Sequence, residues 1–255
     1  MMKQPDTYMI YGANSSIGSE LAKKIFPEVQ NLILFYHNKT ERIGDLISNS
    51  KVLSYQSDIK NFNDFKEKIN DVFIKKEIMN LAAVFLPAIR SYDHKPLVDT
   101  SLEITQEIIE VNLLGVVHFL KGLLQNRLHE SQNCNFQTNI VLLGSNVSRI
   151  GLKNGSIYSA TKAAMANLTR SVAMEVGKAN ILINTISPGP VETDNSYFLK
   201  DYIRFREEYF ETQKAFTSLK KIASINEICS LICFLTSLDN THITGEEIFV
   251  TGGAL

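Results

Sequence analysis

The sequence predicts an α/β fold, a doubly wound parallel sheet with helices on both faces. Short apolar runs alternate along the chain with longer segments whose apolar residues recur at helical spacing, and this alternation is typical of parallel sheets. A length of 255 residues with 44% hydrophobic content is enough to bury one large core. No internal repeat or low-complexity stretch interrupts the pattern. We therefore expect one domain spanning residues 1–255.

The expected strands are short apolar runs, and the first of them, Thr7–Tyr11, leads directly into a glycine-containing turn. The later strands are expected at residues 32–36, 52–55, 78–82, 140–143, 181–186 and 248–250. Helices are expected between them, including residues 62–74, 102–128 and 159–176. Right-handed crossovers then place helices on both faces, and all strands end at one edge, where open α/β sheets bind ligands.

The turn from Gly12 to Gly18 joins the first strand to a helix. A glycine here lets the backbone approach a pyrophosphate, Ser15 or Ser16 can cap the helix, and the free amides of the first helical turn attract a phosphate. An ordinary turn between a strand and a helix is the alternative interpretation. The pattern favours a Rossmann-type dinucleotide site when other nucleotide-enzyme motifs accompany it.

One such motif is Tyr158-Ser-Ala-Thr-Lys162, which follows Ser145. In a helix, positions i and i+4 share one face, so the Lys162 ammonium is expected beside the Tyr158 phenol. A free phenol has a pKa of about 10, and a neighbouring cation favours the phenolate, which brings the group towards the range useful for proton transfer. An exposed helical pair is the alternative for an isolated motif of this kind. Together with the glycine turn, the pattern favours catalysis on a carbonyl or alcohol.

Several motifs, in the same order, resemble those of the short-chain dehydrogenase/reductase family, including its 3-oxoacyl-ACP reductases, from one end of the chain to the other. The glycine turn resembles the family's Thr-Gly-x-x-x-Gly-x-Gly loop, and Asn112 stands in Val-Asn-Leu-Leu-Gly as the family's helix Asn does. The resemblance implies that Asn112, Ser145, Tyr158 and Lys162 are catalytic. It implies that Tyr158 exchanges a proton with the substrate oxygen, which Ser145 holds. Lys162 would lower the Tyr158 pKa and bind the nicotinamide ribose, and Asn112 would kink its helix around a proton-relaying water.

The resemblance also implies contacts with a nicotinamide dinucleotide. At the glycine turn these are Gly12, Asn14, Ser15, Ser16, Ile17 and Gly18. Elsewhere they are His37, Asn38, Asp58, Ile59, Asn80, Ala82, Tyr158, Lys162, Pro188, Gly189, Val191 and Thr193. Asn80 and Ala82 are included because Asn80-Leu-Ala-Ala83 resembles the family's Asn-Asn-Ala-Gly strand end.

The end of the second strand predicts which dinucleotide is preferred. Tyr36 stands where members of the family that use NAD carry Asp, and no acid is present to repel a 2′-phosphate. His37, Asn38 and Lys39 could receive that phosphate. We therefore expect NADP(H) in preference to NAD(H), although the family's basic residue in the glycine loop is replaced by Ser15.

Other departures from the family pattern leave alternatives open. Ser16 replaces the middle glycine of the loop and adds a side chain near the phosphates, while Leu81 and Ala83 replace the second Asn and the Gly of the strand-end motif. A nucleotide-binding relative without turnover is therefore a second hypothesis. An epimerase or dehydratase of the extended family would need an appended substrate domain, which this length does not supply.

The substrate is expected to lie under a variable lid at about residues 193–220, where aromatic and charged residues alternate in a pattern that suits amphipathic helices. A ketone, such as a ketoacyl thioester or another small carbonyl compound, is the first expectation for the substrate. A sugar or polyol dehydrogenase of the same family is the alternative.

Composition limits the partners. A net charge of −1 offers no basic field for nucleic acid, and no apolar run approaches the roughly 20 residues that a membrane span needs. The first residues lack an apolar signal core, so a cytoplasmic location is expected. Apolar residues at 113–124 and 163–176 are too numerous for one buried helix face, which predicts a homo-oligomer, a tetramer or a dimer.

No metal site is expected. Cys229 and Cys233 stand at i and i+4 in an apolar helical pattern, which is typical of core thiols, and the five histidines lack metal-ligand spacing.

Overall fold

The computed structural model describes residues 2–86, 95–130, 136–193 and 200–254. Its centre is a seven-stranded sheet in the order β3-β2-β1-β4-β5-β6-β9, and every neighbouring pair is parallel. The strands are β1 Thr7–Tyr11, β2 Asn31–Tyr36, β3 Val52–Gln56, β4 Leu81–Phe85, β5 Thr138–Leu143, β6 Ile181–Pro188 and β9 Glu247–Val250. The predicted doubly wound parallel sheet is confirmed. A separate pair joins two short strands, β7 Val191–Glu192 and β8 Ala223–Ser224.

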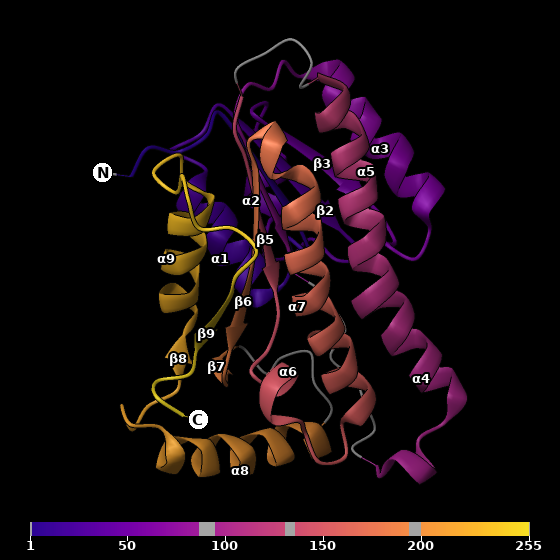
Figure 1. The fold of residues 1–255 in the computed structure, drawn as a ribbon, viewed down its shortest axis with the longest axis vertical. Helices are drawn as coiled ribbons and strands as arrows, with labels where there is room; N and C mark the ends of the chain where they lie inside the picture. The colour runs from indigo at the N-terminus through magenta and orange to yellow at the C-terminus, as the bar shows by residue number, and fades with distance from the viewer. Residues whose placement is uncertain (1, 87–94, 131–135, 194–199, 255) are drawn as a thin grey trace.

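Helices cover both faces of the sheet (Figure 1). The longer ones are α1 Ser16–Ile25, α3 Phe62–Lys75, α4 Leu102–Ile109, α5 Gly115–Glu130, α7 Ser156–Val176, α8 Lys200–Phe216 and α9 Ile225–Thr236. The short helices α2 Gly44–Ile47 and α6 Val147–Ile150 follow β2 and β5. Figure 1 shows α1 and α9 side by side on one face, while α3, α5 and α7 lie on the other.

Alternation along the central strands divides the core into two layers. In β1, Met9 and Tyr11 belong to the cluster under α3, α5 and α7, whereas Tyr8 and Ile10 belong to the cluster under α1 and α9. Successive side chains of a strand point to opposite faces, so a strand covered on both sides is apolar throughout. This explains why β1 and β4 are continuous apolar runs rather than alternating ones.

The predicted helix at residues 102–128 is confirmed with an interruption. Between α4 and α5 the backbone forms a π-helical turn at Glu110–Leu114, and Asn112 lies fully buried at its centre. Single π turns inside helices occur often at functional sites. The turn packs against α7, the helix that carries Tyr158 and Lys162.

The predicted strand at residues 78–82 is wrong in its bounds, because β4 begins at Leu81 and ends at Phe85. The carbonyl oxygens of Ile78 and Met79 accept hydrogen bonds from the buried Arg127 guanidinium, both at 3.0 Å. The amide of Asn80 donates to the Asp6 carboxylate. These side-chain contacts occupy the backbone of residues 78–80, so the apolar Ile78 and Met79 precede the sheet rather than joining it.

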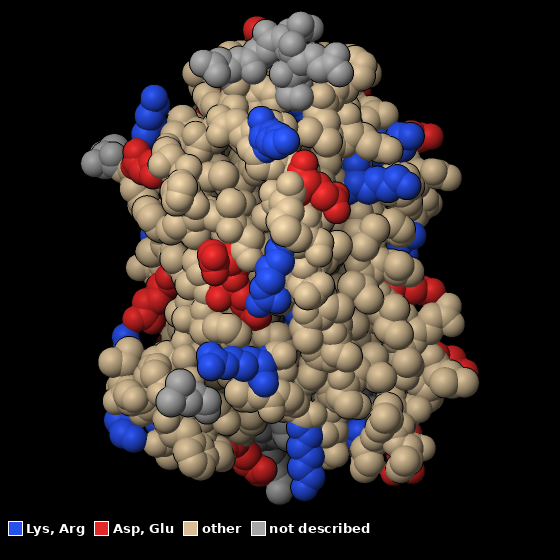
Figure 2. All heavy atoms as spheres, viewed as in Figure 1, with Lys and Arg blue, Asp and Glu red and all other residues tan. Residues whose placement is uncertain are grey.

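The surface and the helices agree with the composition. Figure 2 shows lysine and arginine side chains interspersed with aspartate and glutamate on one face, without a continuous field of either sign over the described residues in view. Within the described ranges, none of the helices is both long and apolar enough to cross a bilayer.

Candidate active site

The glycine turn after β1 is closed by its own hydrogen bonds. Gly12 has φ +87°, and a Cβ on this residue would lie 2.5 Å from the carbonyl oxygen of Leu86. Only glycine fits a backbone in this region at such close approach. The Ser15 hydroxyl accepts from the Gly18 amide at 3.0 Å and donates to the Gly12 carbonyl at 2.7 Å. Of the two predicted caps, Ser15 is therefore the one that caps α1, and Ser16 is the first residue of the helix.

The structure places the other residues of this turn in different roles. Ile17 is 8% exposed and packs in the core under α9, so only its backbone belongs to the turn. A Cβ at Gly18 would overlap the Gly12 carbonyl oxygen. The two glycines thus let the turn fold tightly against Leu86, with α1 beginning at Ser16, and a helix that starts directly after a strand in this way fits a pyrophosphate at its N-terminus.

Arg42 reaches the glycine turn from the loop after β2, a contact that the sequence pattern did not predict. The Asn14 side-chain oxygen accepts from the Arg42 amide at 2.9 Å, and the Arg42 guanidinium donates to the Asn14 carbonyl at 3.3 Å. Glu41 lies at the same place, with its carboxylate 3.4 Å from the Asn14 side-chain nitrogen. A basic residue a few positions beyond the second strand was the available signal, but its reach back to Asn14 depends on the fold of the loop.

An open cleft of about 630 Å³ lies beyond the ends of β2 and β3. His37, Asn38 and Asp58 line it, and the His37 ring nitrogen Nε2 is 3.9 Å from an Asp58 carboxylate oxygen. Ile59 is buried, and its carbonyl oxygen lies 2.7 Å from Nδ1 of His118 on α5. Asp58 and the two residues after β2 are thus brought to one cleft, while the Ile59 side chain lies beneath it.

Ser145 and Tyr158 line a single cavity of about 120 Å³, together with Gly189. Ser145 follows β5, and its hydroxyl oxygen lies 3.4 Å from the Val147 amide at the start of α6. Asn146, Val147, Leu152 and Pro190 also line it, and α8 contributes Arg206, Tyr209 and Phe210. A hydroxyl and a phenol therefore face one small space with an aromatic wall.

Lys162 lies behind Tyr158 on α7. Its side-chain nitrogen is 5.5 Å from the centre of the Tyr158 ring and donates to the Leu143 carbonyl at 2.9 Å. The residue is 3% exposed, and this burial lowers the pKa of the ammonium group to about 7. The Lys162 amine thus lies beside the Tyr158 phenol, as their i, i+4 spacing predicts.

Asn112 is buried in the π turn, and neither of its side-chain polar atoms has a hydrogen-bond partner among the described residues. Buried amide groups are nearly always satisfied by protein or by water. The site therefore fits the water-bridging role that the family resemblance implies for this residue.

The segment after β6 lies against both the Ser145 turn and α8. The amide of Asn146 donates to the Pro188 carbonyl at 2.8 Å, and the amide of Gly189 donates to the Val250 carbonyl at 3.0 Å. Further along, the buried Arg206 guanidinium donates to the carbonyl oxygens of Val191 and Thr193, at 3.0 and 3.1 Å. Arg206 appeared in the sequence only as one basic residue of the lid segment; in the structure it holds that segment to residues 191–193. Residues 194–199 of the predicted lid lie outside the described residues.

Two predicted cofactor contacts are wrong in position. Asn80 precedes β4, at the opposite end of the strand from Gly12, and its side-chain oxygen accepts from the Gln137 amide at 3.0 Å. Ala82 is fully buried inside the strand. The residue that follows β4 beside Gly12 is Leu86, whose amide donates to the Tyr11 carbonyl. The Asn-x-Ala match of Asn80-Leu-Ala-Ala83 to the family motif therefore lies at the start of β4, whereas the motif belongs to the end of the strand.

Among the described residues, no group of histidine, cysteine, aspartate and glutamate side chains is arranged to hold a metal ion. Cys229 and Cys233 are buried free thiols, and burial raises the pKa of Cys229 to about 12.

Known proteins resemble this chain over nearly its whole length. A family model described as Enoyl-(Acyl carrier protein) reductase matches residues 12–254. A 3-oxoacyl-(acyl-carrier-protein) reductase of Buchnera aphidicola subsp. Acyrthosiphon pisum is 25% identical over 251 residues, which cover 97% of this chain and 96% of that protein. A tropinone reductase homolog of Arabidopsis thaliana is 30% identical over 190 residues, covering 74% of this chain and 67% of the homolog.

Solved structures give the same result. A structure titled short-chain dehydrogenase/reductase SDR:Glucose/ribitol dehydrogenase, from Brucella melitensis, matches with a TM-score of 0.82 and 26% identity, covering 100% of this chain and 99% of that one. The structure of ElxO with NADP bound matches with a TM-score of 0.83 and 25% identity, with the same coverage. With a glycine turn after β1, a Ser-Tyr-Lys group at the sheet edge and a family match over residues 12–254, the chain belongs to the short-chain dehydrogenase/reductase family of oxidoreductases.

Proposed function

We propose that the chain reduces a ketone, or oxidises the corresponding secondary alcohol, with NADP(H), and that Tyr158 is the general acid/base. The observation that carries this proposal is the shared cavity of Ser145 and Tyr158, with Lys162 packed 5.5 Å from the Tyr158 ring centre. The proposed enzyme is one catalytic domain, residues 1–255, whose segment 193–220 acts as a substrate lid.

In the proposed reaction, Ser145 donates a hydrogen bond to the substrate carbonyl oxygen and Tyr158 gives its phenolic proton to that oxygen. The bound nicotinamide supplies the hydride in this direction and accepts it in the other. In alcohol oxidation Tyr158 removes the hydroxyl proton. A positively charged Lys162 stabilises the phenolate that forms, and a water held by Asn112 returns a proton towards Lys162.

The cofactor would be held by four strand ends. Its pyrophosphate would lie at Gly12 and the start of α1, its adenosine at His37, Asn38 and Asp58, and its nicotinamide near Lys162 and the segment 188–193. Arg42 supports the preference for NADP(H), because a guanidinium at the glycine turn offers a 2′-phosphate the cation that Ser15 does not supply. NADP bound to ElxO, a structural relative, agrees with this assignment.

The proposed substrate is a ketoacyl thioester or another small carbonyl compound. The cavity wall of Leu152, Pro190 and Phe210 suits an apolar substituent beside the carbonyl, and a 3-oxoacyl reductase stands among the relatives. A sugar or polyol dehydrogenase is the second candidate, favoured by the structural neighbour from Brucella melitensis that is described as a glucose/ribitol dehydrogenase. The hydroxyls of a polyol would be met by the polar side chains of Asn146 and Arg206, which line the same cavity.

The proposed assembly is a homo-oligomer, a dimer or a tetramer. Ile109, Leu114 and Val117 expose 37%, 44% and 37% of their surface on α4, the π turn and α5, and Met174 on α7 exposes 81%. A second copy would bury these side chains. Light scattering tests this proposal, and a monomer at micromolar concentration would contradict it.

The function is tested in two steps. Fluorescence of bound reduced cofactor should give a lower Kd for NADPH than for NADH. Turnover should then be measured with acetoacetyl-CoA, small ketones, and sugars or polyols in the oxidative direction. We expect reduction of acetoacetyl-CoA or of a small ketone. Oxidation of polyols alone would favour the second candidate, and NADPH binding without turnover of any compound would favour a non-catalytic relative.

A further inference from the structure

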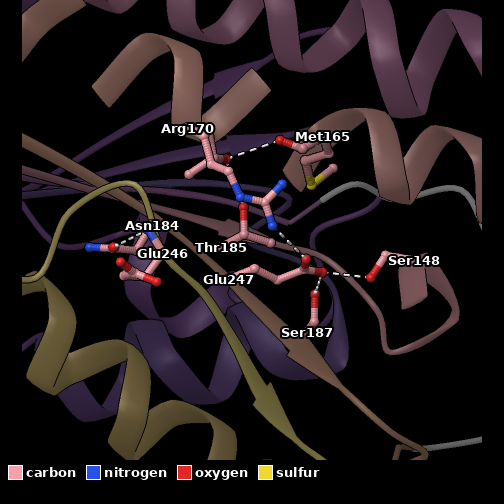
Figure 3. Close-up of polar contacts among 9 residues, drawn as sticks. Ser148, Met165, Arg170, Asn184, Thr185, Ser187, Glu246 and Glu247 are labelled. Carbon is pink, nitrogen blue, oxygen red and sulfur yellow. Dashed lines mark hydrogen bonds and ion pairs between the residues drawn. The ribbon is translucent and has the colours of Figure 1, made fainter. Parts of the chain in front are cut away.

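A largely buried carboxylate lies behind the Ser145 turn and has no part in the proton transfer proposed above. Glu247 is the first residue of β9, and its side chain is 9% exposed. One carboxylate oxygen, Oε1, accepts hydrogen bonds from the hydroxyls of Ser148 and Ser187, at 2.5 and 2.7 Å. The other, Oε2, lies 3.5 Å from the Arg170 guanidinium (Figure 3).

These three partners belong to the segments that supply the proposed site. Ser148 is in α6, three residues after Ser145, and Ser187 precedes Pro188 on β6. Arg170 is on α7, the helix of Tyr158 and Lys162. Figure 3 shows the Ser148, Ser187 and Arg170 side chains converging on Glu247 from separate elements. A single carboxylate therefore joins the Ser145 turn to the segment next to the proposed nicotinamide site.

The position of Ser187 fixes the chain just before Ser145. Ser187 is fully buried, and a Cβ on Gly144 would lie 2.5 Å from its hydroxyl oxygen. The backbone of Gly144 thus lies directly on the hydroxyl that Glu247 orients. Movement of that hydroxyl would be passed to Gly144 and to the Ser145 side chain that follows.

The two serine hydrogen bonds contribute more to holding the Glu247 carboxylate than the arginine contact does. Hydrogen bonds to a charged acceptor are about twice as strong as neutral ones, and both serine bonds are short. The Arg170 side chain is 52% exposed and its contact is long, and exposed ion pairs of this kind contribute little. The two oxygens of Glu247 therefore have separable roles.

We propose that Glu247 is a positioning residue, which holds Ser145 and the Pro188–Gly189 segment in the geometry that hydride and proton transfer require. This inference rests on the proposed function of the site. Misplacement of reacting groups by about 1 Å lowers turnover by roughly 100-fold while leaving remote binding contacts in place. Glu247 should therefore act chiefly on kcat, because the proposed pyrophosphate and adenosine contacts at Gly12, His37 and Asn38 lie at other strand ends and would hold NADPH.

The test compares Glu247→Ala with Glu247→Gln, using acetoacetyl-CoA and NADPH as probes. Glu247→Ala removes both serine contacts and should lower kcat by roughly 10- to 100-fold, with the NADPH Kd changed by less than about twofold. Glu247→Gln keeps an oxygen at the Oε1 position and should retain kcat within about threefold. Glu246→Gln is the matched control, because Glu246 is the exposed neighbour and loses the same charge; its kcat should equal that of the wild type.

A second measurement needs no turnover. In the cofactor-free protein, hydrogen exchange of the amides at residues 144–150 and 187–189 should be faster in Glu247→Ala than in the wild type. Exchange at the glycine turn, residues 12–18, should be unchanged. Equal exchange at residues 144–150 in the two proteins would overturn the proposal.

The kinetic outcomes separate this proposal from the proposed function. In Glu247→Ala, kcat and the fraction of protein that binds NADPH could fall in proportion, without rescue in Glu247→Gln. Glu247 would then have a folding role only, and the inference would be overturned. Wild-type kcat in Glu247→Ala, beside an inactive Tyr158→Phe, would overturn the inference alone. Full turnover in Tyr158→Phe would instead remove the proposed function.

Discussion

The side-chain nitrogen of Lys162 lies 5.5 Å from the centre of the Tyr158 ring and donates a hydrogen bond to the Leu143 carbonyl oxygen. The one-turn spacing of the two residues on α7 places them together, and the end of β5 supplies the acceptor. Burial lowers the pKa of Lys162 to about 7, so its charge responds to pH near neutrality.

This burial predicts a pH dependence of stability. Burial lowers the Lys162 pKa from 10.5 to about 7 in the folded chain, so between these values the unfolded chain binds more protons at this residue. The contribution of Lys162 to the free energy of unfolding therefore rises as the pH rises from 7 to 10. The difference in unfolding free energy between the wild type and Lys162→Met, from urea denaturation, should rise over this range. A difference that is constant from pH 7 to 10 would contradict the burial of a titrating amine.

The glycine turn gives a prediction for stability and binding together. Gly12→Ala places a Cβ against the Leu86 carbonyl at a φ of +87°, which should lower the free energy of unfolding by about 1–3 kcal/mol and weaken NADPH binding. Gly44→Ala is the control. A Cβ on Gly44 would have no neighbour within 4 Å, and the Gly44 backbone does not have a left-handed φ. Denaturation and cofactor titration of both variants test this. Equal stability of the two would be the contrary result.

Much of the fold could be predicted from the sequence, because the apolar runs of the strands and the helical spacing of residues are both local patterns. Apolar runs gave six of the seven sheet strands nearly in place, and a parallel sheet brings all strand ends to one edge. The i, i+4 spacing of Tyr158 and Lys162 likewise predicted that the two side chains lie together, and both are on α7. Where a side chain's environment depends on its own helix or strand, the sequence was sufficient.

The rest depended on contacts between distant segments. The bounds of β4 were missed because Asp6 and Arg127 hold the backbone of residues 78–80 outside the sheet, and neither lies near those residues in sequence. The same error placed Asn80 and Ala82 at the wrong end of the strand. Arg42 and Arg206 were missed as site residues because each acts on backbone carbonyls that only the tertiary fold brings within reach.

Arg42 should discriminate between the two cofactors. If its guanidinium meets the 2′-phosphate, Arg42→Ala should weaken NADPH binding about tenfold, equivalent to about 1.4 kcal/mol, and leave NADH binding unchanged. Lys23→Ala removes one positive charge from the exposed surface of α1 and serves as the control. Cofactor fluorescence titrations measure both. An equal loss of affinity for NADPH and NADH would assign Arg42 to the structure of the glycine turn alone.

Arg206 should control the substrate side of the cavity. Arg206→Met removes the donors to Val191 and Thr193 that hold α8 over the site, and the KM for acetoacetyl-CoA should rise about tenfold. Lys214→Met on the same helix removes a cation that pairs with exposed Glu211 but donates no hydrogen bond to Val191 or Thr193 among the described residues, and it should leave KM unchanged. Steady-state kinetics of the two variants test this, and equal KM values would remove α8 from the proposed lid.

The most direct test is turnover by Tyr158→Phe, measured beside NADPH binding and thermal unfolding of the same protein. Removing the phenolic hydroxyl leaves the ring against Lys162 and should preserve Tm and the NADPH Kd. General acid–base catalysis contributes about 100- to 10,000-fold, so kcat should fall by at least about 100-fold. A folded Tyr158→Phe protein that binds NADPH and turns over acetoacetyl-CoA at the wild-type rate would contradict the assignment of Tyr158 as the proton donor.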